Sequence, residues 1–95
     1  MKIRKIEESR EKCAEAGWYA YDYFLEEPME DSFIYALRPL GSFVYLSMLK
    51  EPFFKIEGDC FMIKGVRGKD YFRAAVHDSN RAFLETVTEY VEKCG

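Results

Sequence analysis

The stretch from Phe53 to His77 constrains the fold of this chain more than any other part of the sequence, because it predicts three short strands joined by two tight turns. Gly58-Asp59 and Arg67-Gly68 are turn dipeptides, and runs of alternating apolar and polar residues flank each of them. Neighbouring side chains along a strand point to opposite faces of a sheet. The stretch therefore predicts an antiparallel three-stranded unit with two distinct faces.

Two-residue turns fix a register in which the large apolar side chains share one face. The predicted pairs on that face are Ile56 with Phe61, Phe54 with Ile63, Ile63 with Phe72, and Phe61 with Ala74. The opposite face collects Phe53, Lys55, Glu57, Cys60, Met62, Lys64, Val66, Lys69, Tyr71, Arg73, Ala75 and His77. A slip of one residue would mix the two sets, so the pattern specifies the register.

Periodicity predicts two elements nearer the N-terminus. Apolar residues at helical spacing predict a helix over Lys2–Ala16, which Gly17 would end. Alternating aromatic residues over Trp18–Leu25 predict a strand. The segment Glu26–Ser32 is acidic, contains a proline and predicts a connection.

Two further predictions complete the fold. Phe33–Arg38 and Phe43–Lys50 predict a hairpin across a four-residue loop. Asp78 or Ser79 is a typical N-cap for a C-terminal helix. The predicted buried stripe of that helix is Phe83, Leu84, Val87, Tyr90, Val91 and Cys94. The sequence thus predicts one α+β domain over residues 1–95, an antiparallel meander of about five to six strands flanked by an N-terminal and a C-terminal helix.

Composition limits the classes of partner. The chain has 8 Phe, 7 Tyr and 1 Trp, which supplies a folded core and excludes intrinsic disorder. Its net charge of -3 disfavours nucleic acid and anionic lipid as partners of the whole molecule. The longest apolar stretch is far shorter than the ~20 residues of a membrane span. The charged segment Met1–Ser9 is unlike a signal peptide.

The cysteines predict a reducing compartment. Cys13, Cys60 and Cys94 are odd in number, far apart and without CxxC spacing. They are therefore predicted to be free thiols of a cytoplasmic protein, and the sequence predicts neither a metal nor a cofactor.

Cys60 and His77 form the one candidate catalytic pair. In the predicted register Ala75 opposes Cys60, which puts His77 one diagonal step away on the same face. A thiol beside an imidazole suits an activated nucleophile. The plainer interpretation is a structural cysteine near a strand-terminal histidine. The consecutive residues His77, Asp78 and Ser79 do not form a triad, because neighbours along a strand point to opposite faces.

A basic strand face is the second candidate site. Residues 59–77 carry four Lys or Arg against two Asp or Glu, a local charge of +2 on an acidic chain. Its candidate ligand-contacting residues are Lys55, Lys64, Lys69, Tyr71 and Arg73. Cations beside an aromatic ring suit a phosphate-bearing or single-stranded nucleic acid partner. The alternative is an ordinary solvated strand face.

Two other surfaces have both a functional and a structural interpretation. The stripe of Tyr19, Tyr21 and Tyr23 suits either an interface or the rim of a sheet. The acidic loop around Pro28 suits either a cation or basic partner, or simple solubility.

Two helices have to cover a sheet whose two faces are both apolar. If both pack on one side, the residues predicted to stay exposed on the other are Ile34, Phe43, Tyr45, Leu49, Phe53 and Met62. We expect this arrangement, and with it a homodimer stacked sheet to sheet. Helices on opposite sides would suit a monomer.

The leading functional hypothesis is a non-enzymatic binding module with a protein or small-molecule partner. Its predicted partner-binding residues are Lys64, Lys69, Tyr71, Arg73, Tyr45 and Met62. The alternatives are a thiol enzyme using Cys60 and His77, and a single-stranded nucleic-acid-binding module using the face of Lys64, Tyr71 and Arg73.

Overall fold

The computed structural model describes residues 1–9 and 17–94. Within them the chain forms the strands β1 (Ile3–Glu8), β2 (Trp18–Leu25), β3 (Ser42–Leu46), β4 (Phe53–Gly58), β5 (Phe61–Val66) and β6 (Tyr71–His77), and the helices α1 (Asp31–Ala36) and α2 (Phe83–Lys93). Two 3-10 turns, η1 (Arg38–Leu40) and η2 (Asp78–Asn80), precede β3 and α2. The strands form one antiparallel sheet in the order β1-β2-β6-β5-β4-β3. The predicted α+β fold is confirmed.

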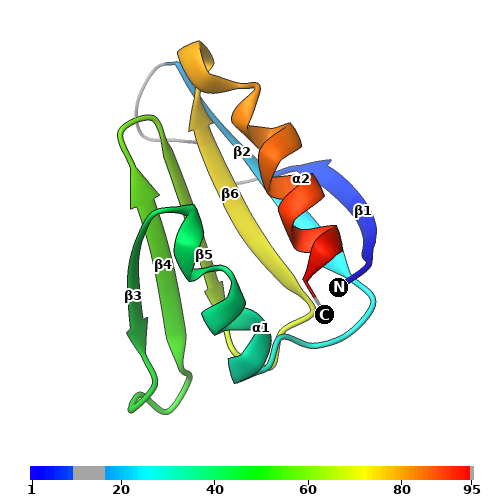
Figure 1. The fold of residues 1–95 in the computed structure, drawn as a ribbon, viewed down its shortest axis with the longest axis vertical. Helices are drawn as coiled ribbons and strands as arrows, with labels where there is room; N and C mark the ends of the chain where they lie inside the picture. The colour runs from blue at the N-terminus through cyan, green and yellow to red at the C-terminus, as the bar shows by residue number, and fades with distance from the viewer. Residues whose placement is uncertain (10–16, 95) are drawn as a thin grey trace.

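Both helices lie on the same face of the sheet (Figure 1). Val87 and Val91 of α2 and Ile34 of α1 are completely buried there. They meet the sheet residues of the core, which are Tyr23, Leu25, Phe54, Ile56, Ile63, Phe72 and Ala74. Full burial of one side chain of this size contributes roughly 1.5–3 kcal/mol. This single apolar layer therefore holds the helices to the sheet.

The strands β4, β5 and β6 sort their side chains onto two faces as the sequence predicts. Phe54, Ile56, Ile63, Phe72 and Ala74 are all buried on the helical side. The register differs by two residues in both hairpins, because Ile56 lies opposite Ile63 and Ile63 lies opposite Ala74. An even shift leaves each side chain on its own face, so the sorting survives the error.

The first hairpin differs because its glycine lies in a strand. Gly58 is the last residue of β4 and pairs with Phe61, so the turn consists of Asp59 and Cys60. A Cβ atom on Gly58 would lie 2.0 Å from Cε1 of Phe61. The phenyl ring therefore needs glycine at this position.

The second hairpin closes through the longer loop 67–70, because Gly65 is the last paired residue of β5 and faces Phe72. Gly68 in this loop has φ +89°, a conformation that favours glycine. Its amide donates to the carbonyl of Met29, and the amide of Met29 donates to the carbonyl of Lys69. These bonds fasten the loop to the connection that precedes α1.

The predicted N-terminal helix is wrong over the residues that the structure describes. Ile3–Glu8 forms β1 and pairs with β2, and the predicted helical residues 10–16 lie outside the described residues. Ile3 is half-buried and Ile6 is 44% exposed. With so little apolar burial, main-chain pairing with β2 decides the conformation. The predicted strand Trp18–Leu25 is confirmed as β2.

The predicted hairpin of Phe33–Arg38 with Phe43–Lys50 is also wrong. The first segment is helical and buries Phe33, Ile34 and Leu37 together. That spacing lies on one face of a helix, whereas a strand would turn Ile34 away from the other two. The strand β3 covers only the first half of the second segment and pairs with β4.

The C-terminal helix is confirmed, but its predicted start is wrong. Its apolar residues pack on the core as expected: Phe83, Leu84, Val87, Tyr90, Val91 and Cys94. The predicted caps Asp78 and Ser79 lie in η2, and α2 begins at Phe83. The imidazole of His77 caps η2 by accepting a hydrogen bond from the amide of Ser79.

Candidate functional site

The sheet face turned away from α1 and α2 is the main candidate site, and we call it the open face. Core residues and open-face residues alternate along each strand. The open face comprises Lys5, Glu7, Trp18, Ala20, Asp22, Phe24, Ser42, Val44, Leu46, Phe53, Lys55, Glu57, Met62, Lys64, Val66, Tyr71, Arg73, Ala75 and His77. Within residues 1–9 and 17–94, no helix packs on it.

An apolar row crosses the open face from β2 to β3. Phe24 pairs with Tyr71, and their rings lie 5.6 Å apart. Further along the row Phe53 pairs with both Val66 and Leu46. Tyr71 and Leu46 are each 37% exposed. Lys5 Nζ lies over the Phe24 ring at 4.8 Å, and from Tyr71 to Leu46 the row exposes an apolar strip that no helix of the described residues covers.

A charged row runs beside the apolar one. Arg73 Nε donates to Asp22 Oδ1 at 2.8 Å, and the two side chains are only 19% and 16% exposed. Lys55 forms an ion pair with Glu57 at 2.7 Å. Lys64 lies between Arg73 and Lys55 in the register and has no ion pair among the described residues. Most of the charge on this row is neutralised within the molecule.

The structure brings together four of the six predicted partner-binding residues. Met62, Lys64, Tyr71 and Arg73 lie on the open face. Lys69 lies outside the strands, in the loop 67–70.

The sixth predicted residue, Tyr45, lies on the helical side of the sheet, where its hydroxyl donates to Asp31 Oδ1 at 2.5 Å. Burial, together with the neighbouring carboxylate of Asp31, raises the pKa of Tyr45 to about 12. This hydrogen bond joins β3 to the start of α1. Ile34 and Phe43, predicted to be exposed on the second face, also belong to the helical side.

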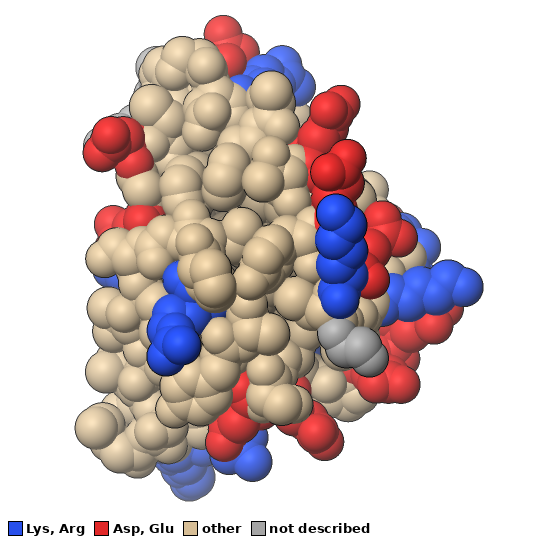
Figure 2. All heavy atoms as spheres, viewed as in Figure 1, with Lys and Arg blue, Asp and Glu red and all other residues tan. Residues whose placement is uncertain are grey.

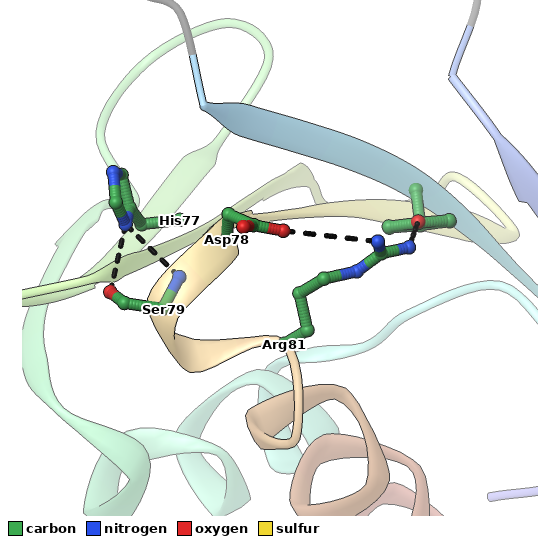
Figure 3. A network of polar contacts seen from close by, with 5 residues as sticks. His77, Asp78, Ser79 and Arg81 are labelled. Carbon is green, nitrogen blue, oxygen red and sulfur yellow. Dashed lines mark hydrogen bonds and ion pairs between the residues drawn. The ribbon is translucent and has the colours of Figure 1, made fainter.

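Cys60 and His77 are neighbours, but through a different register from the predicted one. Ala75 faces Met62, and the amide of His77 donates to the carbonyl of Cys60 at 2.9 Å. The hydroxyl of Ser79 lies 2.8 Å from His77 Nδ1 and 3.8 Å from Cys60 Sγ. Figure 3 shows the imidazole engaged with both the hydroxyl and the amide of Ser79. The histidine therefore holds the turn η2.

The tyrosine stripe is partly structural, through a residue that sequence reasoning missed. Arg81 Nη2 donates to the hydroxyl of Tyr21 at 3.0 Å, and its guanidinium lies 4.8 Å from the ring centre of Tyr19. Tyr23 is buried and donates to the carbonyl of Leu84. A run of aromatics followed by a distant arginine gives no signal for this contact.

Two hollows lie beside the helices. One of about 380 Å³ is lined by Ile6, Tyr21, Tyr23, Leu84, Glu85, Thr88 and Glu89. The other, of about 610 Å³, includes Glu26, Glu27 and Glu30 of the acidic loop and reaches Cys94. Burial raises the pKa of the Cys94 thiol. Tyr23 is a buried ionisable residue of the first hollow, and its hydroxyl is already engaged by the carbonyl of Leu84 and the hydroxyl of Thr88.

Two kinds of feature are absent from the described residues. They contain no cluster of three or more histidine, cysteine or acidic side chains placed to hold a metal ion. None of their helices is both long enough and apolar enough to cross a membrane.

Comparison with known proteins adds no family to this description. No family model, no curated protein and no solved structure matches the chain. The open face is therefore interpreted from its own geometry.

Proposed function

We propose that the protein is a non-enzymatic binding module that forms a homodimer by stacking its open face on that of a second copy. The observation that supports this is the placement of both helices on one side, which leaves the apolar row from Tyr71 to Leu46 without cover. Exposed apolar rows of this kind mark interaction surfaces.

The size of the open face suits such a partner. Six strands ~4.8 Å apart, each about six residues long at ~3.3 Å per residue, give on the order of 600 Å² in projection. Accessible surface exceeds projected area because side chains roughen it, and standard interfaces bury about 800 Å² per partner. Stacked sheets lie ~10 Å apart, which lets side chains of both faces interdigitate.

The charges on the open face are compatible with burial against a second copy. Arg73 and Asp22 already satisfy one another, as do Lys55 and Glu57. Lys64 is the cation whose desolvation is left uncompensated. A partner rich in carboxylates or phosphates would form an ion pair with Lys64. A second copy would bury Lys64 without an ion pair, at a cost in desolvation. Substitution at this residue therefore separates the two kinds of partner.

The free thiols support a reducing, cytoplasmic environment as part of the proposal. Cys60 and Cys94 are both unpaired, and reduced cysteines are typical of that compartment. A protein or small-molecule partner that binds Lys64 and Tyr71 would compete with stacking, because both residues lie within the open face.

Sedimentation equilibrium of the wild type and of Phe53→Glu tests the proposal. The wild type is expected to dimerise, and a carboxylate in the apolar row is expected to raise the dimer dissociation constant at least ~100-fold. Met48→Glu is the matched control, because Met48 is 82% exposed and lies in the loop between β3 and β4. A wild type that stays strictly monomeric at high concentration contradicts the homodimer.

Lys64→Met tests the identity of the partner. With a second copy as the partner, removal of the uncompensated cation is expected to lower the dissociation constant several-fold. With an anionic partner such as single-stranded nucleic acid, the same substitution would weaken binding and reduce its dependence on salt.

A further inference from the structure

The outer edge of β3 is a second feature that the fold leaves without a partner. β3 is the last strand of the sheet, and no segment of the described residues pairs beyond it. An edge strand presents unpaired amide and carbonyl groups that another strand can bind. Which groups face outward follows from the hydrogen bonds of the neighbouring strands.

Hydrogen-bonded pairs alternate with non-hydrogen-bonded pairs along an antiparallel ladder. The amide of His77 donates to the carbonyl of Cys60, so even-numbered residues of β5 bond β6 and odd-numbered residues bond β4. Carrying this alternation across β4 makes the even-numbered residues of β3 the ones that bond β4. The amides and carbonyls of Phe43 and Tyr45 therefore point outward from the edge.

The side chains of β3 leave this edge undefended. All five residues, Ser42–Leu46, are uncharged, and none is proline. Val44 is 46% exposed and Leu46 is 37% exposed. Natural edge strands normally carry charges, prolines or bulges that block pairing. A strand without any of these suits addition of a further strand.

We propose that β3 pairs with β3 of a second copy, in antiparallel orientation about a two-fold axis through Val44. In this register Phe43 faces Tyr45 of the partner subunit, so the outward main-chain groups of both copies meet. It is the register that pairs the whole of Ser42–Leu46 with itself. The result is one sheet continuous across both copies, with their open faces on the same side.

A second copy fits this edge better than an unrelated charged strand would. The strand that the edge accepts is uncharged and apolar on both faces, because Val44 lies on one side and Phe43 and Tyr45 lie on the other. The chain supplies such a strand in β3 itself. Its other edge strand, β1, carries Arg4, Lys5, Glu7 and Glu8 and lacks that character. Edge pairing does not depend on stacking of the open faces, and the two contacts can coexist.

Disulfide trapping tests the register. Val44→Cys, in a background with Cys13, Cys60 and Cys94 replaced by serine, places two thiols at a central non-hydrogen-bonded pair. The Cα atoms of such a pair lie ~4.5 Å apart, within disulfide range. We expect most of the protein to be cross-linked under mild oxidation. Stacked faces alone would bring the two thiols together only if the two-fold axis of the stack happened to pass through Val44, and they would not reproduce the cross-linking pattern of the edge register.

Ser42→Cys in the same background is the matched control. Ser42 faces Leu46 of the partner subunit in this register, so the variant is expected to stay uncross-linked alone and to link when mixed with Leu46→Cys. Cross-linking of Ser42→Cys alone, or none for Val44→Cys, overturns the proposal.

Amide hydrogen exchange gives a readout on the unmodified protein. The amides of Phe43 and Tyr45 are expected to slow at least ~10-fold as concentration rises, because pairing gives them acceptors. The amide of Val44, which already bonds β4, serves as the internal reference. Rapid exchange of both outward amides at every concentration overturns edge pairing, even if sedimentation shows a dimer built through the open faces.

Discussion

The two edges of the sheet, β1 and β3, are built from opposite chemistry. On β1, Lys5 forms an ion pair with Glu7 at 3.0 Å and lies 4.8 Å from the ring centre of Phe24, and Arg4 reaches Asp70 at 3.6 Å. The strand β3 carries no charge at all. Figure 2 shows the same contrast, with acidic and basic side chains more numerous on the β1 side of the molecule than on the β3 side. The charged edge strand β1 is therefore protected from pairing with a further strand, whereas the uncharged edge strand β3 is not.

Val44→Lys would give β3 the protection that β1 has. A cation at the centre of the proposed pair is repelled by its copy, so edge association is expected to weaken at least ~100-fold. The exchange rates of the Phe43 and Tyr45 amides measure this directly. Met48→Lys adds the same charge outside the strand and is expected to leave those rates unchanged. Unaltered protection in Val44→Lys would show that charge does not govern this edge.

Removing the charges of β1 is the converse experiment. The triple variant Arg4→Thr, Lys5→Val and Glu7→Val leaves Glu8 as the one charge of β1, which is expected to raise self-association about tenfold. Lys5→Arg conserves the charge and is the control. Sedimentation velocity over a concentration series measures the change. If the triple variant associates no more than wild type, the charges of β1 are not what closes that side.

Tyr45→Phe tests what attaches β3 to the helical layer. Loss of the hydrogen bond to Asp31 is expected to cost ~1 kcal/mol in the free energy of unfolding. The folded-state pKa of Tyr45 is raised to about 12, so its contribution is complete below the ordinary tyrosine pKa and is lost as pH rises through about 12.

Denaturant titrations between pH 9 and pH 12 measure this contribution. Burial also raises the pKa of Tyr23, so the quantity of interest is the difference between the wild type and Tyr45→Phe. That difference should shrink as pH rises. A difference that stays constant with pH contradicts the role of the Tyr45 hydroxyl.

Lys5→Ala is expected to have the smallest effect. The ion pair with Glu7 is half exposed on both sides, and such pairs contribute ~0–1 kcal/mol and are screened by salt. The loss in unfolding free energy should be largest at low ionic strength and absent near 1 M salt. A loss independent of salt would point to packing of the lysine stem on Phe24 instead.

The sequence predicted those parts of the sheet in which the alternation of apolar and polar residues along a strand matches the sheet face that each side chain occupies. Period-two alternation located β2 to the residue and sorted the side chains of β4, β5 and β6 correctly. Exact pairing was out of reach, because it depends on the phenyl ring of Phe61 above Gly58. The same ring contact moved the turn by one residue.

The wrong predictions share a physical cause. Ile3–Glu8 is a strand because β2 offers it a ladder, and Phe33–Leu37 is helical because three of its side chains reach one core. Neither reason is visible in the segment itself. The open face could be predicted as a class of surface, but Tyr45 was assigned to the wrong side, because the predicted hairpin gave β3 the wrong partner.

The strand order carries a consequence for folding kinetics. The strands β3 to β6 each pair with the next strand in the sequence. The strand β2 pairs with β6, and Tyr21 lies about fifty positions from its partner Ala74. Closing so long a loop is slow, so we expect this pairing to form late. The N-terminal hairpin therefore docks after the meander has formed, on a template that is the last strand to be synthesised. Destabilising substitutions in β2 should therefore mainly increase the unfolding rate, whereas those in β5 should mainly decrease the folding rate.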